Sequence, residues 1–203
     1  MQRYRPTKTA LRRLVAAAQN QGGYFTTRQA REIGYSHTHL NYHVRAHNFQ
    51  RVDHGLYRLP EIPLAEHDDL IRLSFWSRDR NDEPQAVFSH QTALAIQGLS
   101  DLMPARIHLT VPRLFRKHAP RGTVIHRSSL HRSDVEQREG FKVTTALRTL
   151  IDVAADETVA PEQLERAVSE ALEQGLVRES KLRAAANDFQ VAERLRPVLA
   201  GGQ

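Results

Sequence analysis

Residues 26–59, TTRQAREIGYSHTHLNYHVRAHNFQRVDHGLYRL, decide the fold of the N-terminal part of this chain. Thr26 and Gln29 have the spacing of a capping box, which predicts that a short helix begins here. Gly34 predicts the end of that helix, because glycine readily adopts the left-handed conformation that closes helices. The pattern therefore indicates a short helix followed directly by a tight turn.

A second helix is expected after the turn Gly34-Tyr35-Ser36. Ser36 is a favourable N-cap residue, and Leu40 and Val44 share one predicted buried face. Residues 50–59 then alternate between apolar and polar side chains, and Asp53-His54-Gly55 interrupts the alternation. Such an interruption predicts a hairpin with a tight turn.

An amphipathic helix over residues 7–19, with Thr7 as its N-cap, is expected to precede this stretch. Tyr24-Phe25 is too short to predict more than a β-bridge. The resulting order is helix, short helix, tight turn, helix and hairpin, which is typical of a winged helix-turn-helix. A generic small helical bundle with a hairpin has the same order, so the charge distribution has to distinguish the two.

Positive charge is concentrated in this first part of the chain. The 203 residues carry a formal net charge of +6. Residues 1–60 hold ten Lys and Arg against two acids, a balance of +8, whereas residues 61–203 hold nineteen against twenty-one, a balance of −2. A basic surface attracts the phosphates of nucleic acids. The distribution therefore favours a winged helix-turn-helix that binds double-stranded DNA.

The whole chain is expected to be α+β. Pro60 and Pro63 mark a linker between a DNA-binding domain of residues 1–60 and a second domain of residues 64–203. The second domain is predicted to hold a small antiparallel sheet, with a hairpin between two of its strands, at 106–112 and 123–126. Further strands are expected at 86–88 and 141–143, and helices at 65–78, 89–98, 145–155, 161–174 and 179–189.

Several stretches carry a resemblance to a known family. They are GYFTTRQA at 23–30, YHV at 42–44, RVDHGLYRL at 51–59, FSHQTAL at 88–94, GLSD at 98–101, IHLTVP at 107–112 and TTALRTLID at 144–152. In combination they resemble the AbiEi-like antitoxins of type IV toxin–antitoxin systems, over roughly residues 20–155. The resemblance implies a DNA-binding protein that represses its own operon and opposes a toxin similar to a nucleotidyltransferase.

The predicted recognition helix exposes a polar face opposite its buried side. On that face Arg45 can form a bidentate contact with guanine, and Asn41 can pair with adenine. Thr27 and Ser36 stand at helix starts, where they either cap the helix or contact phosphate, and Arg58 is the expected phosphate contact of the wing. The predicted DNA-binding residues are Thr27, Arg28, Ser36, Thr38, His39, Asn41, Tyr42, Arg45, Arg51, His54 and Arg58.

A second concentration of positive charge lies in residues 102–133, which contain seven Lys and Arg and no acid. The predicted hairpin of 106–126 exposes part of this charge on its loop. Either the acids at 79–83 and 134–139 neutralise it, or it forms a second basic surface that fits more DNA, the toxin or the toxin's RNA substrate. The residues of that surface are Arg113, Arg116, Lys117 and Arg121.

The composition excludes several classes of protein. The chain has no cysteine, which excludes disulfide scaffolds and Cys-ligated metal sites and suits the cytoplasm. The sequence has neither a signal-peptide core nor an apolar run of membrane-spanning length. We therefore expect a cytoplasmic protein without a membrane anchor.

Alternatives to DNA regulation need a site, and a few patterns offer one. A metal site on the recognition helix would use His37, His39, His43 and His47. A hydrolase site would use Ser89, His90, Asp101, His108, His126 and Asp152. Glu179-Ser180-Lys181 matches half of a nuclease motif but lies at a predicted helix start, and Arg148 is expected to pair with Asp152. No nucleophile elbow or Gly-rich loop supports an enzyme, so we expect no catalysis, no cofactor and no metal. A regulator that senses a small ligand in its second domain also stays open.

Overall fold

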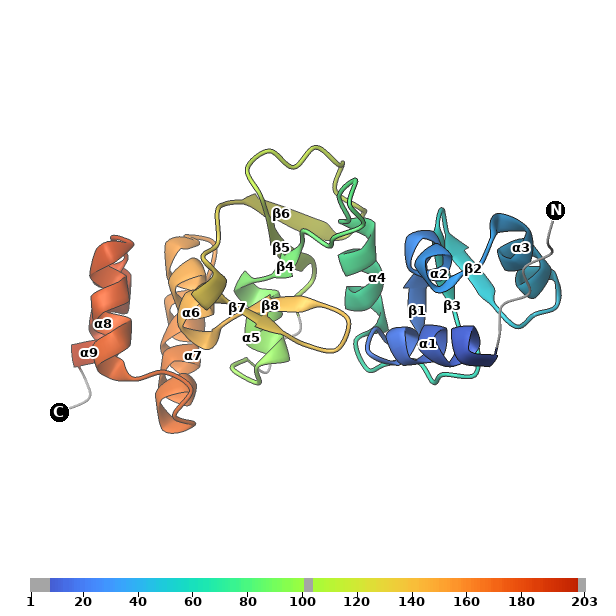
Figure 1. Ribbon diagram of the computed structural model, residues 1–203. Coiled ribbons are helices and arrows are strands. Elements are labelled where there is room, and N and C mark those ends of the chain that lie inside the picture. Colours follow the sequence, from blue (N-terminus) through green and yellow to red (C-terminus); the bar gives the residue numbers. More distant parts are fainter. Residues whose placement is uncertain (1–7, 101–103, 201–203) are drawn as a thin grey trace. The chain divides into compact units, whose positions relative to one another are not determined.

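The computed structural model describes residues 8–100 and 104–200, which divide into two compact units (Figure 1). Unit 1 comprises Met1–Gln85 with Arg138–Phe141, and unit 2 comprises Ala86–Gln137 with Lys142–Gln203. Thr7, the expected N-cap of the first helix, and Asp101 lie outside the described residues.

Unit 1 has the predicted order of helix, short helix, tight turn, helix and hairpin. Its elements are α1 (Lys8–Gln19), β1 (Tyr24–Thr26), α2 (Thr27–Ile33), α3 (His37–Arg45), β2 (Gln50–Asp53), β3 (Leu56–Arg58) and α4 (Asp68–Trp76). The expectation of a mere β-bridge at Tyr24-Phe25 is wrong, because β1 pairs antiparallel with β3 in a three-stranded sheet of order β1-β3-β2. Tyr24–Thr26 forms a strand, although it is short, because β3 of the hairpin lies beside it and pairs with it.

The helix and turn signals of unit 1 are confirmed. Thr26 forms the capping box with Gln29, and Ser36 forms one with His39. Gly34 closes α2 with a φ of 108°, in the left-handed region. Gly55 in the hairpin turn has a φ of 67°, and its carbonyl accepts a hydrogen bond of 3.0 Å from the N–H of Thr27. That bond ties the turn of the wing to the start of α2.

The core of unit 1 lies between its helices and the small sheet. The largest buried side chains include Leu14 of α1, Phe25 of β1 and Leu40 of α3. The Phe25 ring packs edge-on to Phe49 at 5.1 Å between centroids and stacks on Tyr57 at 5.5 Å. These ring contacts pack the hairpin strand of Tyr57 and the residue before the hairpin, Phe49, against the first strand.

Helix α4 belongs to unit 1, although the predicted linker at 60–63 assigned it to the second domain. Its buried face packs on the first strand: the ring centroids of Tyr24 and Phe75 lie 5.9 Å apart, and the Tyr24 hydroxyl donates to Asp68 at 2.8 Å. Burial and this hydrogen bond raise the pKa of Tyr24 to about 12. The units therefore divide after residue 85, because α4 finds its apolar partner on the N-terminal sheet.

Unit 2 holds a five-stranded sheet in the described residues, in the order β6-β5-β4-β8-β7. The strands are β4 (Val87–Phe88), β5 (Ile107–Val111), β6 (Thr123–Arg127), β7 (Val135–Gln137) and β8 (Lys142–Thr144), and helix α5 (His90–Ile96) follows β4. The α+β class is confirmed, but the sheet is mixed instead of antiparallel. The predicted hairpin is wrong, since β5 and β6 run parallel with Ile107 opposite Thr123. Residues 112–122 are long enough to return the chain to the start of β5, which a tight turn does not do.

Helices complete unit 2. They are α6 (Ala146–Ala155), α7 (Pro161–Glu173), α8 (Glu179–Asp188) and α9 (Ala192–Ala200), of which α9 was not predicted. They share one apolar core with α5, to which Leu94, Leu150, Leu164, Leu182 and Leu195 contribute. Within residues 8–100 and 104–200, no helix has the length and apolarity needed to cross a membrane.

Candidate nucleic-acid interface

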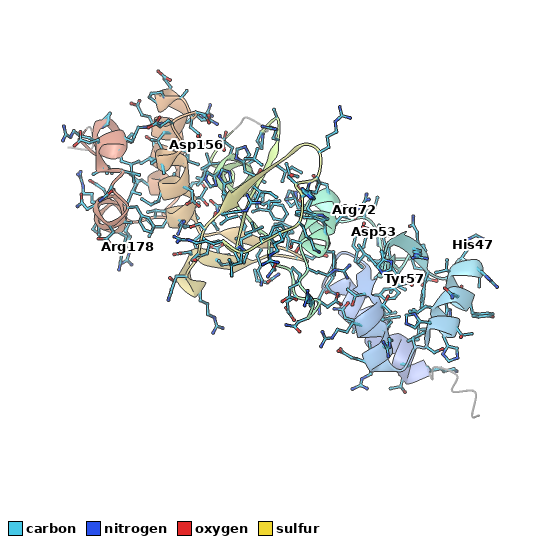
Figure 2. The ribbon with its side chains drawn as sticks, turned by 90° about the horizontal axis from the view of Figure 1, so that it is seen from above. His47, Asp53, Tyr57, Arg72, Asp156 and Arg178 are labelled. Carbon is cyan, nitrogen blue, oxygen red and sulfur yellow. The ribbon has the colours of Figure 1, made fainter. Side chains whose placement is uncertain are left out.

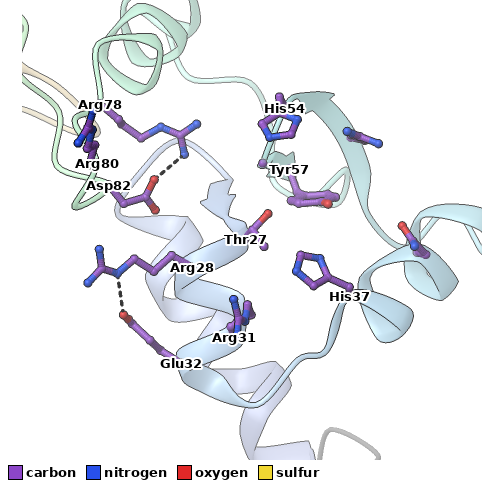
Figure 3. Close-up of a pocket in the computed structure, with 13 residues that line it drawn as sticks. Thr27, Arg28, Arg31, Glu32, His37, His54, Tyr57, Arg78, Arg80 and Asp82 are labelled. Carbon is purple, nitrogen blue, oxygen red and sulfur yellow. Dashed lines mark hydrogen bonds and ion pairs between the residues drawn. The ribbon is translucent and has the colours of Figure 1, made fainter.

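A groove of about 850 Å³ crosses the surface of unit 1 (Figure 3). Helix α2 and Tyr57 form its floor, α3 and the hairpin form one wall, and residues 78–82, which follow α4, form the other. The lining residues are Thr27, Arg28, Arg31, Glu32, His37, Asn41, Arg51, His54, Gly55, Tyr57, Arg78, Arg80 and Asp82.

The groove is basic, because five of its lining residues are arginines and only Glu32 and Asp82 are acids. Two of the arginines are already paired, Arg28 with Glu32 at 3.2 Å and Arg78 with Asp82 at 3.1 Å. The other three, Arg31, Arg51 and Arg80, form no ion pair with any residue that the structure describes. Their charges are therefore available to an anionic ligand, and duplex DNA supplies a regular row of phosphates.

Five of the predicted DNA-binding residues meet at this groove. They are Thr27, Arg28, Asn41, Arg51 and His54, and they come from α2, α3 and the hairpin. Figure 2 shows Asp53 and Tyr57 on the two strands of that hairpin. Residues that are distant in sequence thus line one groove.

Three further predicted residues lie on the exposed side of α3 without lining the groove. Thr38, Tyr42 and Arg45 are all exposed, and Tyr42 keeps 64% of its surface accessible. Tyr42 is therefore not the packed aromatic that a core position would hold. These side chains remain candidates for contacts with base edges.

Ser36 and His39 serve the start of α3. The Ser36 Oγ accepts from the His39 backbone N–H at 3.2 Å, and the His39 Nδ1 accepts from the Ser36 N–H at 3.4 Å. Both polar groups are thus used within the helix cap. Capping, the alternative interpretation of Ser36, is what the structure describes.

Arg58 does not lie on the wing surface, and the expectation that it contacts phosphate is corrected. It belongs to the central strand β3 and keeps only 7% of its surface exposed. Its guanidinium Nη2 donates to the carbonyl of Ile62. The side chains of a strand alternate between two faces, and the face that Arg58 occupies is covered by the segment that leads to α4.

The sequence-based prediction of DNA contacts did not include four basic residues of the groove: Arg31, His37, Arg78 and Arg80. Two of them carried a signal, since Arg31 lies four residues after Thr27 and His37 four before Asn41, which places each pair on one helix face. Arg78 and Arg80 carried none. Only the packing of α4 brings them to this surface.

The four histidines of the alternative metal site on and just after α3 do not gather at one point. His43 stacks on Phe49 at 4.6 Å between centroids, and burial lowers its pKa. His47 lies just beyond the end of α3 (Figure 2). Among the residues that the structure describes, no group of three potential metal ligands has a geometry suited to a metal ion.

Part of the predicted hydrolase set does come together in unit 2. His90 Nδ1 lies 2.9 Å from Ser89 Oγ, and His108 Nδ1 lies 3.1 Å from His126 Nε2. The Ser89 hydroxyl is fully buried and accepts from Thr110 Oγ1 at 2.8 Å. A substrate therefore has no access to this hydroxyl.

Two predicted ion-pair or terminus positions are confirmed. Arg148 Nε donates to Asp152 Oδ1 at 2.8 Å, within a nearly buried pair on α6. Burial raises the pKa of Asp152, against the attraction of Arg148.

Glu179 is the first residue of α8 and pairs with Arg183 four residues later. It therefore lies at a helix start, as predicted, and not at the end of a strand.

The second basic surface lies on the connection between β5 and β6, residues 112–122. All four of its predicted residues are exposed, and so is Leu114, with 87% of its surface accessible. Phe115 is buried and anchors the connection. The charge is thus presented by a crossover connection and not by a hairpin loop. The four residues are Arg113, Arg116, Lys117 and Arg121.

Comparison with known families accounts for most of the chain. The family model described as "Transcriptional regulator, AbiEi antitoxin" matches residues 12–60. The family model described as "AbiEi antitoxin C-terminal domain" matches residues 85–199. No curated protein matches the chain. The crystal structure of the RV2827C protein from Mycobacterium tuberculosis is 17% identical, with 97% of this chain and 83% of that chain covered and a TM-score of 0.44.

Proposed function

Since this chain belongs to the AbiEi antitoxin family, we propose that it is a DNA-binding antitoxin that represses its own operon and opposes a toxin similar to a nucleotidyltransferase. The observation that supports DNA binding most strongly is the basic groove of unit 1. Arg31 and Arg51 bring unpaired charges to it, and Asn41 adds a side chain that can pair with a base.

In the proposed complex, α3 enters the major groove of the duplex. Its exposed residues Thr38, Tyr42 and Arg45 face the base edges there. The basic groove, directly beside α3, receives the phosphates of one strand, and His54 at the hairpin turn contacts the same backbone. Contacts between α3 and the base edges then give sequence preference, and contacts between the groove arginines and the phosphates give affinity.

Duplex DNA binding is tested by fluorescence anisotropy of the full chain, with DNA from upstream of its own gene and with a scrambled duplex, between 50 and 200 mM salt. Each neutralised phosphate changes the slope of log affinity against log salt by about −0.9, so Arg31 and Arg51 alone give about −1.8. Arg31→Gln is expected to weaken binding and flatten the slope. Arg13→Gln removes an exposed arginine of α1 outside the groove and is the matched control. A flat salt dependence of the wild type contradicts the proposal.

The antitoxin role is supported by family membership. It is tested by expressing the gene adjacent to this one, if that gene encodes a nucleotidyltransferase-like protein, alone and together with the chain. Growth arrest by the first protein and recovery with both are expected. Persistent arrest with both proteins detected in the cells contradicts antitoxicity and leaves the DNA measurement unaffected.

We propose that the chain acts in the cytoplasm by binding, without catalysis or a cofactor. The Ser89 hydroxyl is buried, and Glu179 is paired with Arg183 at a helix start. Purified protein is expected to leave duplex DNA uncut in the presence of Mg²⁺ or Mn²⁺. Metal-dependent cleavage that Glu179→Gln abolishes contradicts this part of the proposal.

A further inference from the structure

We propose that residues 78–82, named here the α4 loop, are part of the DNA-binding surface, and that Arg80 binds a backbone phosphate of the duplex. The inference rests on the proposed function and extends it beyond the helix-turn-helix and its wing. The α4 loop lies between the two family matches, which end at residue 60 and begin at residue 85.

The α4 loop is attached to the recognition elements by a direct hydrogen bond. Arg28 of α2, itself a groove residue, donates from Nη1 to the carbonyl of Asn81 at 2.7 Å. The contact holds the loop close to α2, and Arg78, Arg80 and Asp82 of the loop line the groove (Figure 3). A phosphate that lies over α2 therefore lies between the loop and the wall formed by α3.

Hydrogen bonds within the α4 loop and to its neighbours Phe75 and Glu83 hold the loop in its conformation. Asp79 Oδ1 accepts from the backbone N–H groups of Asn81 at 2.8 Å and of Glu83 at 3.0 Å. Arg78 Nε donates to the carbonyl of Phe75 at 2.7 Å. A loop that is ordered before binding loses little conformational entropy when a ligand arrives, which favours affinity.

The two arginines of the α4 loop differ in the charge they offer. Arg78 pairs with Asp82, and its side chain is only 14% exposed, so it braces the loop and its charge is largely offset. Arg80 is exposed, lines the groove and pairs with no acid among the described residues. Arg80 is therefore the residue of this wall that is available to a phosphate.

The distribution of charge fits a polyanionic backbone better than a small anion. The unpaired arginines stand on three different parts of the groove, with Arg31 on α2, Arg51 on β2 and Arg80 on the α4 loop. A single phosphate is bound by groups that converge on one point, whereas successive phosphates of a strand need separated cations. Asn41 of α3, which can pair with a base, lines the same groove.

The test measures the salt dependence of duplex DNA binding by the full chain for Arg80→Gln and Arg72→Gln. Arg72 is an exposed arginine on α4 that does not line the groove (Figure 2). Its variant therefore makes the same change of charge as Arg80→Gln, but outside the groove. Arg80→Gln is expected to weaken binding roughly five- to tenfold at 0.1 M salt and to flatten the slope by about 0.9. Arg72→Gln is expected to bind as the wild type does. Circular dichroism melting checks that both variants are folded.

A variant of opposite sign makes the test sharper. Asp82 has a φ of 71°, a left-handed conformation that asparagine also tolerates, so Asp82→Asn removes a carboxylate from the groove without backbone strain. Arg78 stays anchored by its hydrogen bond to the Phe75 carbonyl, and its charge is no longer offset, so duplex binding is expected to strengthen several-fold.

The inference is overturned if Arg80→Gln behaves like Arg72→Gln while the wild type binds duplex DNA, or if Arg80→Gln weakens binding to duplex RNA alone. Failure of the wild type to bind duplex DNA is a different result, because it overturns the proposed function itself.

Discussion

The imidazole rings of His90 and His126 lie face to face in unit 2, with centroids 3.5 Å apart and an interplanar angle of 12°. His108 joins them through a 3.1 Å contact with His126. Burial, followed by the neighbouring His126 and His108, lowers the pKa of His90 to about 3. The carboxylate of Asp156 raises the pKa of His90 and the guanidinium of Arg148 lowers it. With a pKa of about 3, His90 is neutral in the folded state near pH 7.

Unit 2 is therefore expected to lose stability in acid. The pKa of His90 in the folded state lies below its value of about 6.5 in the unfolded state, so the unfolded state binds a proton first as the pH falls. Unit 2 therefore has its full stability above about pH 6.5. Between about pH 6.5 and 3 the free energy of unfolding falls by up to about 1.4 kcal/mol per pH unit. The measurement is urea unfolding at pH 7.5 and 5.0. His90→Asn, tolerated at the φ of 53°, should reduce the difference.

His47→Asn is the matched control for that experiment, because His47 is exposed and has a similar φ of 58°. It should retain the wild-type loss of stability between pH 7.5 and 5.0. An equal loss in wild type and His90→Asn would show that His90 does not carry the pH dependence.

Arg45→Ala is expected to weaken binding to the operator more than binding to scrambled DNA. A bidentate arginine–guanine contact contributes roughly 1–3 kcal/mol of discrimination between sequences. Arg51→Ala, which removes a groove arginine, should instead weaken both duplexes equally. Competition anisotropy on the two duplexes measures the difference, and equal effects of the two variants contradict the assigned roles.

Arg58→Ala is expected to lower stability without a specific effect on DNA binding. The substitution leaves the carbonyl of Ile62 without its partner and opens space beneath it, at a cost on the order of 1–3 kcal/mol. Thermal unfolding monitored by circular dichroism measures this. Arg51→Ala, on the exposed neighbouring strand, should melt as the wild type does. A normal melting temperature of Arg58→Ala combined with weak DNA binding would show that Arg58 takes part in the DNA contact.

The connection between β5 and β6 is expected to act through its charge. The quadruple change of the second basic surface to Ser spares the buried Phe115, so the fold should be retained. It should reduce either total DNA affinity with its salt slope, or protection against the toxin. Both assays are run on the folded variant. If it matches the wild type in both, this surface is only solvated. The substitutions are Arg113→Ser, Arg116→Ser, Lys117→Ser and Arg121→Ser.

Much of unit 1 was predictable because its signals are local. The capping box at Thr26, the N-cap at Ser36, the glycine at Gly34 and the turn before Leu56 each act within a few residues, and each appears in the structure as expected. The Arg148–Asp152 pair was predictable for the same reason, since residues four apart on a helix are neighbours.

Tertiary structure alone decided the features that depend on contacts between distant segments. The strand at Tyr24 exists because β3 pairs with it, and the parallel pairing of β5 with β6 depends on how the chain crosses over between them. Arg58 is buried because the following segment covers its face.

The groove, too, depends partly on features that the sequence shows and partly on contacts between distant segments. The sequence by itself determined that α2, α3 and the wing carry an excess of positive charge, because charge is a property of composition. Only the packing of α4 against Tyr24 places Arg80 on the opposite wall, because that position depends on which apolar faces meet and not on any nearby residue.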